Sequence, residues 1–110
     1  MTKVSEMEIH YPGITIYEAM QAVHLLAVEK GWWDKHRELP ELLCLVHAEV
    51  SECLEAYREN NAAGVAEELA DIIIRVFDIA AAANIDLEKA IKEKHDYNKT
   101  RPYRHGGKLV

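Results

Sequence analysis

Two pairs of acidic residues with the same spacing indicate where this 110-residue chain could do chemistry. Glu49 and Glu52 form a Glu-x-x-Glu pair, and Glu68 and Asp71 form a Glu-x-x-Asp pair. Residues three apart on a helix are surface neighbours, so each pair can present its oxygens to a common point between packed helices. Together the two pairs predict a cluster of carboxylates.

The expected surroundings of Glu49 and Glu68 differ from those of ordinary surface acids. In helical projection Glu49 lies beside Leu45 and Cys53, and Glu68 lies beside Ile72. Half-buried anions without partners are very costly, so such a cluster needs a positive charge. Oxygen ligands without a Cys or His cluster suit Mg²⁺, or Mn²⁺ in its place, and Mg²⁺ completes its octahedron with substrate phosphates. The acids therefore predict phosphoryl chemistry.

Ion pairs with basic residues are the alternative explanation of these buried acids. Arg75 and Lys94 are the candidate partners, because a Glu-x-x-Glu spacing alone is a weak motif. Asp78 lies two turns beyond Asp71 on the same face, and for it a solvated or salt-bridged role is favoured over metal ligation.

Polar residues near the end of the chain show the complementary pattern. Lys94 and Asn98 fall on the apolar side of their expected helix, beside Ile91, and Arg101 continues that line. An ammonium, an amide and a guanidinium can together clamp phosphate oxygens. Alternatively, Lys94 and Arg101 pair with the acids or extend to solvent.

Four helices are expected to position these residues, and the absence of alternating apolar and polar runs predicts an all-α fold, a four-helix bundle. Thr15 and Glu18 have capping-box spacing, Pro40 suits a first turn, Asn60 and Asn61 with Gly64 close the second helix, and Asp86 suits an N-cap. The expected helices cover residues 16–30, 40–59, 65–83 and 87–100.

The third expected helix is apolar over far more than half of its circumference. A monomer of four short helices cannot easily cover such a surface, so an obligate homo-oligomer is predicted. The residues of its main stripe are Val65, Leu69, Ile72, Ile73, Val76, Ile79 and Ala80.

Length and composition limit the number of domains and the kinds of partner that the chain can have. The length suits one domain over residues 1–110, with a loose N-terminus (1–13) and a loose tail (102–110). A net charge of -6 disfavours long nucleic acid as a partner. The N-terminus lacks the apolar run of a signal peptide or membrane span, so no membrane partner and a cytoplasmic location are expected. Cys44 and Cys53 are nine positions apart on one helix, too far to bridge, and are expected to be buried or half-buried thiols.

The order and spacing of four segments resemble the MazG-like, all-α nucleoside triphosphate pyrophosphohydrolase family. The segments are KGWWD at 30–34, LVHAEVSE at 45–52, EELAD at 67–71 and KxxxNxxRPY at 94–103. The resemblance implies a hydrolase of acid anhydrides that converts (deoxy)nucleoside triphosphates to monophosphate and pyrophosphate, in a role such as nucleotide-pool cleanup. It also implies homodimers or homotetramers.

The resemblance also assigns roles to residues. It implies that Mg²⁺ is held by the two acid pairs and that the phosphates are contacted at Lys94, Asn98 and Arg101. Of the acids, Glu49 or Glu52 is the expected catalytic group that orients or deprotonates the attacking water.

The first helix and the loop after it would correspond to the family's base pocket. Trp32 or Trp33 could then stack on a base, and Gln21 and His24, one turn apart, could reach the base or sugar. Core or interface packing is as ordinary a role for each of them.

Two other functions stay open. One is a related pyrophosphohydrolase acting on a phosphoribosyl nucleotide such as phosphoribosyl-ATP. The other is a non-catalytic helical oligomer that binds nucleotide or metal. The second is disfavoured because a binding module has no need of four metal-ligating carboxylates.

Overall fold

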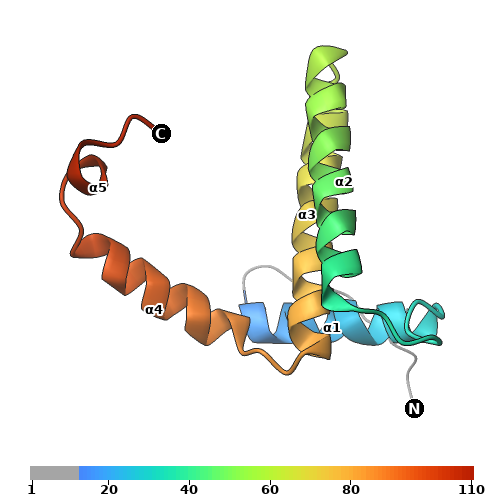
Figure 1. Ribbon diagram of the computed structural model, residues 1–110. Coiled ribbons are helices and arrows are strands. Elements are labelled where there is room, and N and C mark those ends of the chain that lie inside the picture. Colours follow the sequence, from blue (N-terminus) through green and yellow to red (C-terminus); the bar gives the residue numbers. More distant parts are fainter. Residues whose placement is uncertain (1–12) are drawn as a thin grey trace.

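The computed structural model describes residues 13–110, and in this range every regular element is a helix (Figure 1). The all-α class is therefore confirmed, whereas the predicted loose N-terminus lies, apart from Gly13, outside the described residues. The helices are α1 (Ile16–Glu29), α2 (Leu39–Arg58), α3 (Ala62–Ala82), α4 (Leu87–Lys99) and the short α5 (Arg104–Gly107).

Side-chain caps fix the starts of three helices. Thr15 Oγ1 accepts a hydrogen bond from the backbone N–H of Glu18 at 3.0 Å, as the capping-box spacing predicts. Asp86 caps α4 in the same way through the N–H of Lys89. Caps of this kind satisfy N–H groups that have no partner inside the helix. The predicted starts of α1 and α4 are therefore confirmed.

The turn between α2 and α3 is tighter than expected. Gly64 was expected in the break between the helices, but it lies in the first turn of α3, and Asn61 Oδ1 accepts from its N–H at 2.9 Å. A Cβ atom at position 64 would lie 2.5 Å from Asn61 Nδ2. A side chain at position 64 would therefore require the Asn61 amide to shift. Helix α3 begins three residues earlier than predicted.

α2 and α3 form an antiparallel hairpin, and α1 lies across one end of it (Figure 1). α4 then leads away from the hairpin and packs mainly on α1, where Glu88 Oε1 accepts from the backbone N–H of Tyr17 at 3.3 Å. Residues 13–110 therefore do not form the expected four-helix bundle, since α4 contacts mainly α1 and none of its residues is buried. The expected loose tail contains α5, the fifth helix.

The apolar core of the described residues is small. Its buried members are Met20, Leu42, Ala56 and Ala80. Large side chains on the hairpin, among them Leu54, Leu69 and Ile73, are about half exposed. Cys53 is half-buried as expected, but Cys44 is exposed, and both thiols are free. Residues 13–110 thus leave many large apolar side chains exposed.

Among the described helices, none combines the length and apolar character that crossing a membrane would require.

Candidate metal centre and adjoining cavity

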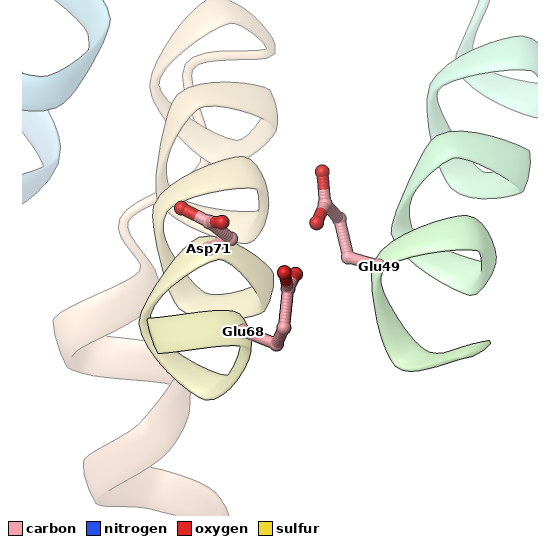
Figure 2. A group of neighbouring side chains, drawn as sticks. All are labelled: Glu49, Glu68 and Asp71. Carbon is pink, nitrogen blue, oxygen red and sulfur yellow. The ribbon is translucent and has the colours of Figure 1, made fainter. Parts of the chain in front are cut away.

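Three of the four predicted acids come together between α2 and α3. Glu49 comes from α2, and Glu68 and Asp71 come from α3, with one carboxylate oxygen of each lying within 4.8 Å of the others. Figure 2 shows Glu49 and Glu68 extending towards each other from the two helices, with Asp71 one turn along from Glu68. The hairpin brings the three carboxylates together because α2 and α3 run antiparallel and in contact.

Two oxygens of this group have no hydrogen-bond partner. Glu49 Oε1 accepts from Arg75 Nε at 2.8 Å, but Glu49 Oε2 and Glu68 Oε2 are buried and unpaired among the described residues. Buried polar atoms are normally satisfied, so two adjacent exceptions require an explanation. A hard divalent cation fits both, because its ligands in proteins are oxygens of this kind.

The electrostatics of Glu49 and Glu68 differ although the residues are neighbours. Burial, together with the nearby carboxylates of Glu49, Glu52 and Asp71, raises the pKa of Glu68 from 4.5 to about 7. The hydrogen bond from Arg75 lowers the pKa of Glu49. The protein's own residues therefore leave negative charge at this point only partly balanced.

Glu52, the fourth predicted ligand, lies at the edge of this group. Its side chain is exposed, and it is not one of the three acids whose oxygens converge. It is nevertheless close enough for its charge to raise the pKa of Glu68. Of the ion pairs considered as an alternative, the one between Arg75 and Glu49 is present.

A cavity of about 590 Å³ opens beside the acids. Its volume falls within the range of sites for small molecules and cofactors, which is roughly 300–1,000 Å³. Glu49, Asp71 and Arg75 line it together with apolar residues of α1 and with Ile74. Its other polar lining residues are Glu18, Lys30, Trp32, Arg37 and Asp78. The acids thus share one hollow with residues that follow α1.

Of the residues predicted for a base pocket, Trp32 lines this cavity, with 65% of its surface exposed. Trp33 has a different environment: its Nε1–H donates to both carboxylate oxygens of Asp78, at 3.0 and 3.2 Å. His24 Nδ1 lies 2.7 Å from Asp78 Oδ1, and the His24 and Trp33 rings meet edge to face at 5.5 Å. Gln21 is half-buried on α1 and is not part of the cavity lining.

Asp78 joins the first loop to α3. It bonds to both His24 and Trp33 and also lines the cavity. The sequence assigns no site role to Arg37 or Lys30, and it predicts Arg75 only as an ion-pair partner of the acids. For Arg75 a signal was available, because it lies one helical turn after Asp71 and therefore on the same face.

The predicted phosphate-binding residues do not reach the acids within the chain. Lys94 and Asn98 are exposed on α4 and line a separate hollow of about 380 Å³ with Leu87, Ile91 and neighbours. Lys94 Nζ lies 4.9 Å from the ring centroid of Tyr97, and the Arg101 guanidinium lies 5.8 Å from the same ring. Lys94 and Asn98 therefore do not face inward among the described residues, because α4 leaves the hairpin, whereas Arg101 is half-buried.

The fold and the site together define an all-helical protein with a carboxylate group beside a cavity that could hold a nucleotide. Comparison with protein families identifies the MazG nucleotide pyrophosphohydrolase domain, whose family model matches residues 37–105. The match covers more than half of the chain, so the chain belongs to the MazG family. It spans α2, α3 and α4 and includes both acid pairs, whereas α1 and the two tryptophans precede it. No curated protein and no solved structure matches the chain.

Proposed function

We propose that this protein hydrolyses (deoxy)nucleoside triphosphates to the monophosphate and pyrophosphate in a reaction that depends on Mg²⁺. The observation that carries the proposal is the pair of buried, unpaired oxygens on Glu49 and Glu68 beside a cavity large enough for a nucleotide. Membership of the MazG family supports pyrophosphohydrolase chemistry in particular.

The roles of the acids follow from their chemistry. Glu49, Glu68 and Asp71 would hold the cation, with Glu52 at the edge of the group. When bound, Mg²⁺ supplies positive charge that offsets the charge developing on the phosphates. Glu49, kept ionised by Arg75, or Glu52 would orient or deprotonate the attacking water. Trp32, which lines the cavity and is exposed, would stack on the base.

A homo-oligomer, a dimer or tetramer, completes the proposal. The hairpin leaves large apolar side chains half exposed, which a monomer rarely does over so large an area. Lys94, Asn98 and Arg101 would then serve a site shared between subunits, because α4 does not carry them to the acids of its own chain. The acidic hairpin and the basic end of the chain are complementary in charge.

Product identification tests the activity. The protein is incubated with Mg²⁺ and a panel of ribo- and deoxyribonucleoside triphosphates plus phosphoribosyl-ATP, and both products of each reaction are identified. Monophosphate and pyrophosphate are expected. Orthophosphate and diphosphate would contradict the cleavage position, and turnover of phosphoribosyl-ATP alone would reassign the substrate. Binding without turnover of any nucleotide would identify a non-catalytic protein.

A further inference from the structure

Arg75 connects the buried acids to the open cavity. It lies on α3, one helical turn after Asp71, and its Nε donates to Glu49 Oε1 at 2.8 Å. Its side chain is 38% exposed, whereas that of Glu49 is 12% exposed. The guanidinium therefore has one edge against a buried carboxylate while the side chain as a whole reaches the cavity, which it lines.

The hydrogen bond to Glu49 uses a small part of what Arg75 can donate. A guanidinium carries five N–H groups in a planar fork, and the bond to Glu49 takes the one on Nε. Among residues 13–110, no other acceptor bonds to this guanidinium. Its terminal nitrogens thus keep their donors for a ligand.

The other cations of the cavity are placed differently. Arg37 lies over the ring of Trp33, with its Cζ atom 5.8 Å from the ring centroid, and Lys30 lines the cavity from the end of α1. Lys94 and its neighbours line a separate hollow. Among the described residues, Arg75 is the cation that both lines the cavity and contacts one of the three clustered acids, Glu49.

We infer that Arg75 binds a phosphate oxygen of the nucleotide through its terminal nitrogens while its Nε holds Glu49 in place. The inference rests on the proposed function and adds a phosphate-binding residue to it. A phosphate that completes the coordination of a cation held by Glu49 and Asp71 would lie beside Arg75, since all three residues border the same cavity. Arginine suits this position because its planar fork can bond two anionic groups at once.

A purely structural or counterion role makes a different prediction. If Arg75 only neutralised Glu49, its removal would strengthen cation binding and leave phosphate affinity unchanged. If it only oriented Glu49, its removal would weaken cation binding, and any loss of nucleotide affinity would follow from that. The two affinities must therefore be measured separately.

The test compares Arg75→Gln and Arg75→Lys with wild-type protein by calorimetry. The ligands are Mn²⁺ alone and, at saturating Mn²⁺, an α,β-methylene nucleoside triphosphate or inorganic triphosphate. We expect Arg75→Gln to weaken both phosphate ligands, measured at saturating Mn²⁺, by about tenfold to a hundredfold, the range for hydrogen bonds to charged groups, and this loss should exceed any loss of Mn²⁺ affinity. Arg75→Lys should lose less, because it keeps the charge without the fork.

Arg58→Gln is the matched control, because it removes the same charge from an exposed position at the end of α2. It should bind all ligands as wild type does. Unchanged phosphate affinity in Arg75→Gln, or a loss of Mn²⁺ binding that accounts for the loss of phosphate affinity, would overturn the inference alone. Failure of wild-type protein to bind either phosphate ligand would overturn the proposed function and this inference with it. If Arg75→Gln does not fold by circular dichroism, the Arg75→Lys comparison decides, and wild-type affinity there would overturn the inference.

Discussion

Glu49 and Glu68 show how one residue type acquires two protonation behaviours at a distance of a few ångströms. Arg75 favours the ionised form of Glu49, whereas burial and the neighbouring acids favour the protonated form of Glu68. Cation binding must overcome the second effect, because a coordinating carboxylate is deprotonated. The two residues should therefore respond differently to substitution.

Glu49→Gln tests the more acidic of the two. The amide keeps the shape of the side chain but loses its charge, so we expect turnover to be abolished. Mn²⁺ affinity should fall by at least ~10–100-fold, which is the loss typical when a residue that only supports a metal ligand is replaced. Turnover and Mn²⁺ calorimetry measure these effects, and circular dichroism checks the fold. Glu55→Gln, at an exposed position on the same helix, is the control. Retained activity in Glu49→Gln would remove Glu49 from the mechanism.

Glu68 predicts a pH dependence of stability in metal-free protein. Its folded-state pKa of about 7 lies above the ordinary 4.5, so the stability that it contributes is complete below about pH 4.5 and is lost as the pH rises through 7. We expect the free energy of unfolding in urea, with chelator and at fixed protein concentration, to fall between about pH 5 and pH 8 more steeply for wild type than for Glu68→Gln. Equal slopes would show that Glu68 does not titrate in this range.

At the scale of residues, the sequence predicts the acids and names Arg75 as a candidate ion-pair partner, which Glu49 has in the structure, but it does not predict the partners of Asp78. Glu49, Glu68 and Asp71 were identified because acids in an apolar stripe are conspicuous in a periodic pattern. The bonds from His24 and Trp33 to Asp78 could not be predicted, because they join α1, the following loop and α3 through a packing angle that no local pattern encodes.

Helices are the scale at which local rules worked best. The capping residues Thr15 and Asp86 identified the starts of α1 and α4 because an N-cap bond joins residues three apart and depends little on tertiary structure. The start of α3 differs from the prediction because a glycine in this position predicts a break between helices. Its actual role, giving room to the Asn61 side chain, becomes visible once the turn is folded.

A double-mutant cycle at Asn61 and Gly64 tests this account of the turn. Asn61→Ala should destabilise the protein by about 1 kcal/mol through loss of the cap. Gly64→Ala should also destabilise wild type, because its Cβ would meet Asn61 Nδ2 at 2.5 Å, but in the Asn61→Ala background it should be neutral or stabilising. Urea unfolding of the four proteins gives the coupling. Equal effects of Gly64→Ala in both backgrounds would contradict the proposed contact.

The path of α4 marks the limit of prediction from helix patterns. Its amphipathic sequence correctly indicated a helix with one apolar side, but periodicity does not say which surface that side meets. Within the chain it meets mainly α1, and its polar residues stay exposed. No residue of α4 is buried by the described residues.

For the whole molecule, the exposed apolar side chains of the α2–α3 hairpin are the feature on which the proposed oligomer depends. Ile73→Glu places a charge on a half-exposed apolar position of α3, so we expect it to dissociate the proposed oligomer, and sedimentation velocity would report a smaller species. Ala63→Glu adds the same charge at an exposed position in the first turn of α3 and should leave assembly intact. A wild-type protein that sediments as a monomer at all concentrations would contradict the assembly.

The three clustered acids lie within 23 positions of one another in the sequence. Glu49, Glu68 and Asp71 belong to one helical hairpin, so their approach requires closure of a short loop, which is fast. Trp33 contacts Asp78 only when the loop between α1 and α2 packs against α3. In stopped-flow refolding we therefore expect helical ellipticity to recover before tryptophan fluorescence, with Mn²⁺ accelerating the earlier phase. The centre would then be a nucleus around which the chain orders rather than a late product of its assembly.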